Sequence, residues 1–207
     1  EHTPFFYVNK YNLSDKQKEF VELALDPQVK IMLINGPAGS TKTYMAIYAA
    51  LRLLSSSNSA DLLYARTIVE SADRNMGFLP GNADEKFNPY MLPLLDKLEE
   101  FLKPQDCHRL FKEKRIEALP VNFLRGANWI NKIVVADEAQ NFTFKELTTL
   151  ITRIGENTKL FVCGDFMQSD INGKSGYRAM CERFSDEESK KMGIHTFKFG
   201  VEDIKRS

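Results

Sequence analysis

The residues with the clearest chemical role form one short stretch near the start of the chain. Residues 36–43 read GPAGSTKT, and they follow an apolar run at residues 31–34. A glycine-containing loop between a buried strand and a helix turns backbone N–H groups toward a polyphosphate, where the helix dipole favours negative charge. Lys42 would reach the β- and γ-phosphates of a nucleotide, and the Thr43 hydroxyl would hold Mg²⁺. We therefore expect nucleotide contacts from Gly36, Pro37, Ala38, Gly39, Ser40, Thr41, Lys42, Thr43 and Tyr44.

One position in this loop departs from the phosphate-binding pattern G-x-x-x-x-G-K-[ST]. The pattern has glycine directly before the lysine, and this chain has Thr41. A β-branched residue would narrow the room for phosphate there, and it would be strained if the backbone required a positive φ. The threonine therefore predicts a weakened or altered nucleotide site. The competing interpretation is a glycine-rich turn that carries a lysine by chance.

A second polar cluster follows an apolar run at residues 133–136. Asp137 and Glu138 come directly after this run. A strand that ends in two acids predicts a metal-associated carboxylate, Asp137, beside a residue that orients the attacking water, Glu138. Gln168 follows the next apolar strand, where a polar side chain can sense the γ-phosphate. The alternative for Asp137 and Glu138 is a pair of acids in a solvated loop with no role in catalysis. The alternative for Gln168 is a glutamine in an ordinary turn.

Gln17 can be interpreted in two ways that do not exclude each other. Ser14 and Gln17 have the spacing of a capping box, which starts a helix and needs no further function. A glutamine about 20 residues before a phosphate loop also lies where several helicase-like ATPases read adenine. Both readings stay open at this point.

The overall composition limits the classes of function. The 207 residues include 28 Lys and Arg against 28 Asp and Glu, so any contact with nucleic acid must be a local patch. The three cysteines have no C-x-x-C spacing, which is typical of free thiols in a reducing cytoplasm. No apolar stretch approaches the roughly 20 residues of a membrane span, and no signal peptide opens the chain. The lack of an initiator Met suggests that residues are missing upstream.

The pattern of apolar residues predicts the elements that position these side chains. Helices are expected at residues 13–25, after the phosphate loop, at 88–102 with a kink at Pro93, from Thr143 to Arg153, and as a hairpin over 175–192. Strands are expected at residues 31–34, 61–66, 116–124, 133–138, 159–163 and 195–199. The alternation predicts an α/β fold with a mainly parallel sheet, helices on both faces and right-handed crossovers. We expect one domain over residues 1–207, with residues 1–12 as an arm packed across it.

Taken in order, these motifs resemble those of PhoH-like proteins. The shared segments are GPAGSTKT, GFLPG followed by a helix, LRG, DEAQN, LITRIG, GDFMQSD and the closing DIKRS, spread over residues 13–206. DEAQN, TRIG and GD-x-x-Q at these spacings are specific, whereas the phosphate loop alone is not. Thr41 is the clearest departure from the family pattern.

The resemblance implies a RecA-like ATPase domain related to superfamily 1 helicases but without their second lobe. It implies binding and hydrolysis of ATP with Mg²⁺, association with single-stranded RNA or DNA, and assembly of a homo-oligomeric ring such as a hexamer. The implied roles fall on Lys42, Thr43, Asp137, Glu138 and Gln168. With no appended domain, the chain resembles the minimal, phage-encoded form of the family.

Two other functions fit the same residues. One is a nucleotide-gated binding module that hydrolyses ATP barely at all, which Thr41 favours. The other is a small-molecule kinase, against which Glu138 and Gln168 argue because a water polarised by these residues would hydrolyse ATP wastefully.

A single RecA-like lobe also lacks the arginine that a second lobe supplies to the nucleotide site in related proteins. Arg153 and Arg206 are the residues expected to supply that charge from a neighbouring subunit.

Overall fold

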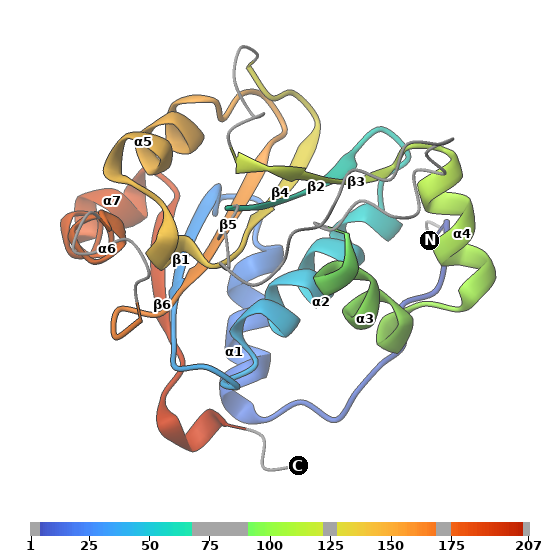
Figure 1. Ribbon diagram of the computed structural model, residues 1–207, viewed down its shortest axis with the longest axis horizontal. Helices are drawn as coiled ribbons and strands as arrows, with labels where there is room; N and C mark the ends of the chain where they lie inside the picture. Colours follow the sequence, from blue (N-terminus) through green and yellow to red (C-terminus); the bar gives the residue numbers. More distant parts are fainter. Residues whose placement is uncertain (1–4, 68–90, 122–127, 169–174, 205–207) are drawn as a thin grey trace, which may run out of the picture.

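A six-stranded sheet forms the centre of the protein (Figure 1). The computed structural model describes residues 5–67, 91–121, 128–168 and 175–204. The strands are β1 (Ile31–Asn35), β2 (Asp61–Arg66), β3 (Ile116–Pro120), β4 (Lys132–Ala136), β5 (Lys159–Gly164) and β6 (Ile194–Lys198). Their order is β3-β2-β4-β5-β1-β6, and every neighbouring pair is parallel. The α/β fold with a parallel sheet is therefore confirmed.

The strand order determines which loops meet. Strand β5 lies between β1 and β4, with Asn35 level with Gly164 and Ala136 level with Val162. The carboxyl ends of parallel strands point to one edge of the sheet, and ligands of open α/β sheets bind there. The phosphate loop after β1, the acids after β4 and the turn after β5 consequently share one edge.

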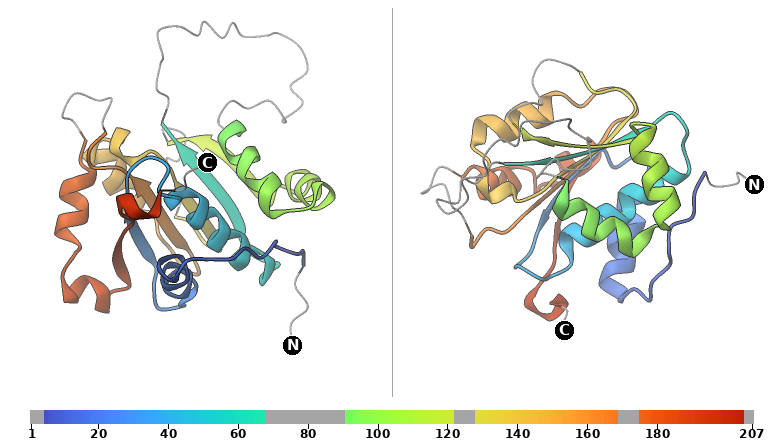
Figure 2. Two further views of the ribbon diagram at one scale, coloured as in Figure 1. Left: turned by 90° about the horizontal axis from the view of Figure 1, so that it is seen from below. Right: turned by 45° about the vertical axis from the view of Figure 1, so that its right-hand side comes forward.

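Helices cover both faces of the sheet (Figure 2). They are α1 (Asp15–Leu25), α2 (Lys42–Ser55), α3 (Leu92–Phe101), α4 (Pro104–Lys112), α5 (Phe144–Thr152), α6 (Tyr177–Arg183) and α7 (Glu187–Lys191). Apolar side chains of α1 to α4 enter one core, and those of α5 and α6 enter the core on the opposite face. Helix α2 is buried without interruption from Met45 to Leu51, because it lies between the sheet and its neighbouring helices.

Two helices begin where the sequence predicts because their starts are encoded locally. In α1 the Ser14 hydroxyl accepts from the Gln17 N–H, and the Gln17 side chain accepts from the Ser14 N–H. Thr143 and Glu146 make the same reciprocal pair at the start of α5. A capping box satisfies two backbone donors that a helix start leaves unpaired, so it fixes the first residue of the helix.

Two predictions about the middle of the chain need correction, and one helix was missed. Helix α3 begins at Leu92, which puts Pro93 in its first turn, where proline is tolerated and produces no kink. The proposed start at Asn88 lies outside the described residues, as does the GFLPG motif. Strand β3 ends at Pro120, short of the predicted residue 124, since proline cannot donate to a further ladder. Helix α4 was not predicted from the sequence.

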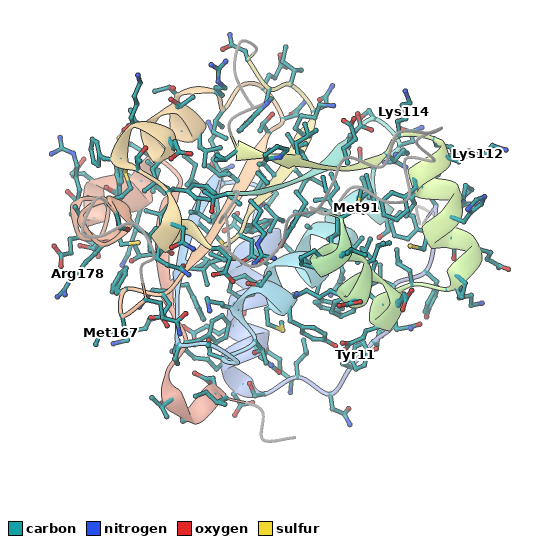
Figure 3. All side chains as sticks on the ribbon, viewed as in Figure 1. Tyr11, Met91, Lys112, Lys114, Met167 and Arg178 are labelled. Carbon is teal, nitrogen blue, oxygen red and sulfur yellow. The ribbon has the colours of Figure 1, made fainter. Side chains whose placement is uncertain are left out.

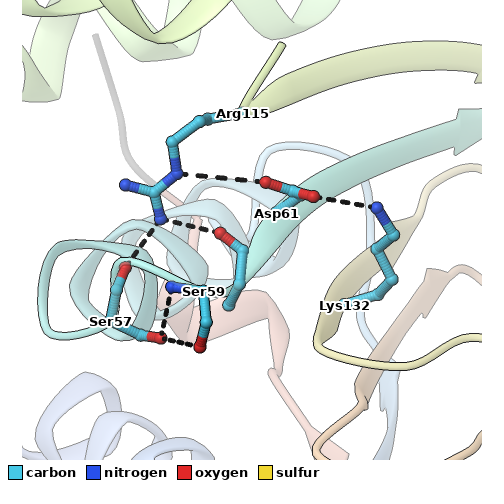
Figure 4. Close-up of polar contacts among 6 residues, drawn as sticks. Ser57, Ser59, Asp61, Arg115 and Lys132 are labelled. Carbon is cyan, nitrogen blue, oxygen red and sulfur yellow. Dashed lines mark hydrogen bonds and ion pairs between the residues drawn. The ribbon is translucent and has the colours of Figure 1, made fainter. Parts of the chain in front are cut away.

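An ion-pair cluster ties the strands together at the amino edge of the sheet (Figure 4). Asp61, the first residue of β2, accepts from Lys132 Nζ at 2.9 Å and lies 3.9 Å from Arg115 Nε. Arg115 also donates to the carbonyl oxygens of Ser57 at 2.6 Å and Ala60 at 2.7 Å. The contacts hold the starts of β2, β3 and β4 level, at the end of the sheet away from the phosphate loop.

The N-terminal segment runs along the helices of the first face. Phe6 is buried, and the Asn9 N–H donates to the Phe101 carbonyl at 2.8 Å. Tyr11, labelled in Figure 3, donates to the Glu100 carbonyl. The ring of Tyr11 meets that of Phe101 edge-on, with the ring centroids 5.6 Å apart. Among the helices described, none is both long and apolar enough to cross a membrane.

Candidate phosphate-binding site

The loop that follows β1 makes a tight turn into helix α2. A Cβ on Gly36 would lie 2.5 Å from the Ser40 hydroxyl and 3.1 Å from Phe199 Cβ, so only glycine fits. The Gly36 N–H donates to the Gly164 carbonyl at 3.2 Å, and the Ser40 N–H donates to the Pro37 carbonyl at 3.1 Å. The Ser40 side chain is fully buried beneath the loop. The Ser40 hydroxyl is buried and has no hydrogen-bond partner among the described residues.

Two residues of this loop have left-handed backbone conformations. Gly39 has φ 77°, which costs glycine nothing, whereas Thr41 has φ 66° and ψ 8°. Such a conformation is an outlier for a β-branched residue and costs about 1–3 kcal/mol. The position before Lys42 thus requires the backbone that glycine adopts freely. The strain foreseen at Thr41 is present in the fold.

Lys42 is the first residue of α2 and lies across the loop. Its Nζ donates to the Pro37 carbonyl at 3.3 Å. The first turn of α2 itself carries no acid, so no residue of the helix offsets the positive end of its dipole. Lys42 and the N-terminus of α2 together make a cationic cradle suited to phosphate.

The phosphate loop and the strand-end acids meet through one hydrogen bond. The Thr43 hydroxyl donates to Asp137 Oδ1 at 2.8 Å, although the two residues are 94 positions apart. Asp137 is 5% exposed, and Oδ1 also accepts from the Glu138 N–H at 2.9 Å. The two residues predicted to hold Mg²⁺ therefore lie within hydrogen-bond distance of each other.

Tyr64, which sequence reasoning missed, supplies a third hydrogen bond to Asp137. Its hydroxyl donates to Oδ2 at 2.6 Å from strand β2, the neighbour of β4. Burial, and next the charge of Asp137, raise the pKa of Tyr64 well above its ordinary value, so the phenol stays a donor. From the sequence, a tyrosine in a buried strand is interpreted as a core residue. Only the pairing of β2 with β4 shows that Asp137 is the hydrogen-bond partner of Tyr64.

Gln140 is a second missed residue, and it connects Glu138 to the turn after β5. Its Nε2 donates to Glu138 Oε2 at 2.6 Å, and its Oε1 accepts from the Asp165 N–H at 3.1 Å. Gln140 is buried, while Glu138 is half-buried with φ 57°. The sequence did contain a signal for this contact, because the side-chain amide of Gln140 is only two residues after the candidate base Glu138 and can reach it.

The turn after β5 is tied to the phosphate loop. The Phe166 N–H donates to Asn35 Oδ1 at 3.0 Å, and Asn35 directly precedes Gly36. Gln168 is exposed at this edge, and its N–H donates to the Asp165 carbonyl at 3.3 Å. Gln168 thus lies on the turn between the phosphate loop and the Asp137–Glu138 pair, where a γ-phosphate sensor is expected.

Beneath the site the packing is close enough to make the floor rigid. A Cβ on Gly164 would lie 2.6 Å from the Tyr177 ring, and Tyr177 donates to the Ile34 carbonyl under the phosphate loop. Cys163 is fully buried next to this point, and burial raises the pKa of its thiol well above the ordinary value. Cys163 is therefore an inert core thiol.

The remaining predicted residues lie at the rim of the site or away from it. Gln17 Nε2 donates to Thr41 Oγ1 at 3.2 Å, which brings helix α1 to the phosphate loop. The Tyr44 ring packs on Phe101 with centroids 4.4 Å apart, so its side chain belongs to an aromatic cluster under α3. Ile204 approaches the loop, since its Cγ2 would lie 3.6 Å from a Cβ on Gly39.

Arg153 is not part of the site formed by its own chain. Arg153 follows α5, and its carbonyl accepts from the Trp129 N–H at 2.8 Å. Trp129 precedes β4, so Arg153 lies toward the amino edge of the sheet, opposite the phosphate loop. Arg206 lies outside the described residues.

The oxygen donors present suit Mg²⁺. A hydroxyl and a carboxylate, from Thr43 and Asp137, converge beside Lys42. Mg²⁺ usually takes one or two protein ligands together with phosphate and water oxygens, which this arrangement permits. No cluster of three His, Cys, Asp or Glu side chains that could hold a metal occurs among the described residues. Thr43 and Asp137 would therefore hold the ion jointly with a nucleotide.

A parallel sheet, a glycine loop leading into Lys42 and Thr43, and an acid that receives the Thr43 hydroxyl define a P-loop nucleotide-binding protein with a RecA-like core. The chain belongs to the PhoH-like protein family, whose model matches residues 11–207.

Relatives of this chain carry the same description. It is 36% identical to a PhoH-like protein of Mycobacterium tuberculosis over 172 residues, which are 82% of this chain and 48% of that protein. It is 36% identical to a PhoH-like protein of Bacillus subtilis over 136 residues (66% and 42%), and 32% identical to Protein PhoH of Escherichia coli K12 over 185 residues (86% and 50%). The chain thus spans about half the length of these relatives.

A solved structure of Bacteroides Pif1 in complex with ADP-AlF4 aligns with 92% of this chain and 42% of its own. The TM-score is 0.39 and the sequence identity is 15%.

Proposed function

We propose that this protein binds ATP with Mg²⁺ at the loop of residues 36–43 and hydrolyses it to ADP and phosphate. The observation that carries the proposal is the 2.8 Å hydrogen bond from Thr43 to Asp137. It joins the cationic cradle of α2 to the acids after β4, which is the arrangement that metal-assisted phosphoryl transfer requires.

Each residue of the site has a distinct part in the proposed reaction. Lys42 exchanges its carbonyl partner for the β- and γ-phosphates, and Thr43 and Asp137 hold Mg²⁺, which neutralises developing charge when bound. Glu138 orients a water in line with the γ-phosphorus and accepts its proton. The bond from water oxygen to phosphorus forms as the bond to the β,γ-bridging oxygen breaks, which releases ADP and phosphate.

Gln140 and Gln168 support this step from either side. The 2.6 Å bond from Gln140 fixes one oxygen of Glu138 and leaves the other for water. Gln168 on the adjacent turn contacts the γ-phosphate, and Gln17 contacts the base. A water-orienting residue acts only when held in place, so the buried amide of Gln140 serves the function as a positioning residue.

A phosphate-release assay with ATP tests the proposal. Release that needs Mg²⁺ and stops with EDTA supports hydrolysis. Binding of ATP without release would support the alternative, a nucleotide-gated module, for which the strained Thr41 is the relevant observation. Formation of ADP without free phosphate, with the phosphoryl group on an added hydroxyl acceptor, would identify a kinase. Failure to bind any nucleotide would refute all three.

Contact with single-stranded RNA or DNA is a further part of the proposal. The net charge of the chain is zero, so binding should depend on a few Lys and Arg contacts, be weak, and tolerate any sequence. Binding of a fluorescent 20-mer at two salt concentrations measures this. Tight binding that salt does not change would contradict it.

Assembly into a ring would bring an arginine to each phosphate site. Arg153 lies toward the opposite edge of the sheet, so in a head-to-tail contact it would face the neighbour. An arginine supplied by a neighbour is worth about 10³-fold or more in rate. Mixing Lys42→Ala with Arg153→Ala or Arg206→Ala subunits should restore activity. A monomer that is fully active at high dilution would exclude this assembly.

A further inference from the structure

We propose that Arg66, at the carboxyl end of strand β2, binds the γ-phosphate of the nucleotide held by its own chain and so raises the affinity of the site for ATP relative to ADP. The inference rests on the proposed function, because it concerns the phosphates of the nucleotide bound there. It assigns a role to a cation that lies outside both the phosphate loop and the acids after β4.

The ladder between β2 and β4 places Arg66 beside Asp137. Arg66 is the last residue of β2, and Asp137 directly follows β4. Ala65 is level with Ala136, and the next backbone hydrogen bond runs from the Asp137 N–H to the Ala65 carbonyl at 2.9 Å. Neighbouring strands lie about 4.8 Å apart. Arg66 and Asp137 are therefore neighbours at the edge of the sheet that carries the phosphate loop.

The side chain of Arg66 belongs to the face of the sheet that carries helix α2. Successive side chains of a strand point to opposite faces, so Arg66 shares its face with Tyr64. Tyr64 is buried in the same core as α2, whereas Ala65 enters the core on the other face. Lys42 and Thr43, at the start of α2, consequently lie on the same side of the sheet as the Arg66 side chain.

The contacts of Tyr64 indicate how far Arg66 can reach. The Tyr64 hydroxyl donates to Asp137 Oδ2, while Thr43 donates to Oδ1 of the same carboxylate. Arg66 is two residues farther along the strand, about 7 Å nearer the edge where the ligand binds, and its side chain is about as long as that of tyrosine. The guanidinium can therefore extend past the Asp137 carboxylate toward the terminal phosphate of a nucleotide.

The electrostatics of Tyr64 agree with this placement. Burial is the largest cause of the raised pKa of Tyr64, and the negative charge of Asp137 adds to it. The positive charge of Arg66 partly opposes both effects, as expected for a guanidinium close to the phenol.

Arg66 has no partner of its own within the part of the chain that the structure describes. Its side chain is half-buried, and none of the ion pairs found there includes it. The neighbouring Asp137 is already occupied by three donors, two hydroxyls and the Glu138 N–H. A half-buried charge without a partner is unfavourable, and the planar donors of a guanidinium match the oxygens of phosphate. An anionic ligand at this edge would supply the missing partner.

The strand order indicates which phosphate lies within reach. Lys42 is placed at the β- and γ-phosphates, and β2 is separated from β1 by β5 and β4. A nucleotide that extends from the phosphate loop across Asp137 presents its last phosphate toward β2. ADP ends one phosphate earlier, so it keeps its contact with Lys42 and loses the contact with Arg66. A hydrogen bond between charged groups contributes about tenfold or more in affinity.

The test compares the affinities for ADP and for the non-hydrolysable ATP analogue AMP-PNP, measured by isothermal titration with Mg²⁺ present. Arg66→Met keeps the length of the side chain and removes its charge. It should lower the ratio of AMP-PNP affinity to ADP affinity about tenfold. Its ADP affinity should stay about the same, which also shows that the variant is folded.

Two further variants serve as controls. Arg66→Lys keeps the charge and should lower the ratio less than Arg66→Met does. Arg178→Ala removes an arginine that is exposed on α6 and paired with Glu182, and it should leave the ratio unchanged.

Three results would contradict the inference. An unchanged ratio in Arg66→Met, or an equal loss of affinity for both nucleotides, would show that Arg66 does not recognise the γ-phosphate. An unchanged ratio with weaker binding of single-stranded nucleic acid would assign Arg66 to a phosphodiester instead. A ratio restored by mixing Arg66→Met with Lys42→Ala subunits would show that Arg66 acts on the nucleotide of a neighbour. If the parent bound neither nucleotide, the proposed function itself would fail, which is a different result.

Discussion

The hydroxyl of Tyr64 donates a 2.6 Å hydrogen bond to the carboxylate of Asp137 from the neighbouring parallel strand. Tyr64 is fully buried, and Asp137 receives its other hydrogen bonds from Thr43 and the Glu138 N–H. The candidate metal-associated acid is thus oriented by core packing as well as by the phosphate loop. A residue with no apparent chemistry in the sequence becomes part of the site through this contact.

Removing this hydroxyl should affect both stability and the site. In Tyr64→Phe the buried carboxylate loses one of its donors, which costs about 1–3 kcal/mol of unfolding free energy. Asp137 also becomes freer to move, so the Mg²⁺ concentration needed for half-maximal phosphate release should rise. Urea unfolding and a Mg²⁺ titration measure the two effects. Tyr7→Phe is the control, because Tyr7 is 60% exposed.

Lys42 and Glu138 should have separable roles. Lys42→Ala removes a phosphate contact and should abolish measurable ATP binding while the far-ultraviolet circular dichroism stays unchanged. Glu138→Gln removes the water-orienting base and should retain ATP binding while turnover falls about 10²-fold or more. Titration calorimetry and phosphate release give the two readings. Equal loss of binding in both variants would refute this division of roles.

Gln140 should matter for turnover more than for binding. Gln140→Ala frees the Glu138 carboxylate and leaves the buried Asp165 N–H without its acceptor. Misplacement of a reacting group by about 1 Å can cost about 10²-fold in rate, so turnover should fall by one to two orders of magnitude with the ATP dissociation constant little changed. Gln168→Ala is the comparison on the adjacent turn. Unchanged turnover in Gln140→Ala would show that Glu138 needs no such support.

Thr41→Gly should stabilise the fold. Relief of a left-handed β-branched residue gains about 1–2 kcal/mol, and the greater flexibility of glycine in the unfolded chain returns about 0.5–1 kcal/mol. We expect a net increase of about 1 kcal/mol or less in the free energy of unfolding by urea. Lys114→Gly is a matched control, because Lys114 is exposed and has φ 55° away from the site. A loss of stability in Thr41→Gly would mean that the hydrogen bond to Gln17 outweighs the strain.

The thiols should be unreactive in the folded protein, and their raised pKa values should make stability depend on pH, an effect that Cys181 allows to be tested. Cys107, Cys163 and Cys181 are all buried and free. Burial raises the pKa of Cys181 from 9 to about 12. The folded state therefore holds this proton longer than the unfolded chain, and the stability it contributes below pH 9 is lost as the pH rises toward 12.

Reaction with a disulfide reagent at pH 8 should need denaturant, which tests the first point. Urea unfolding at pH 8.5 and 10.5, compared between parent and Cys181→Ala, tests the second. The comparison is necessary because burial lowers the pKa of Lys159 to about 8, which acts in the opposite direction over the same range. A parent that lost no more stability than Cys181→Ala would contradict the assignment.

Features encoded by neighbouring residues were predictable from the sequence alone. The phosphate loop, the acids after β4 and the capping boxes at Ser14 and Thr143 depend on contacts within a few residues. The strands and most helices followed from apolar periodicity. The kink predicted at Pro93 was wrong because proline fits the first turn of a helix as readily as a kink, and local signals do not decide between the two.

The sequence itself thus determined which chemical groups this protein carries and whether each one lies in a loop, at a strand end or at a helix start. Only the tertiary structure decided their partners: Tyr64 for Asp137, Asp165 for Gln140, and Gln17 for Thr41. The physical reason is the order of the strands. Burial of apolar faces sets β2 beside β4 and β5 between β4 and β1, and residues far apart in the chain meet at the edge that results.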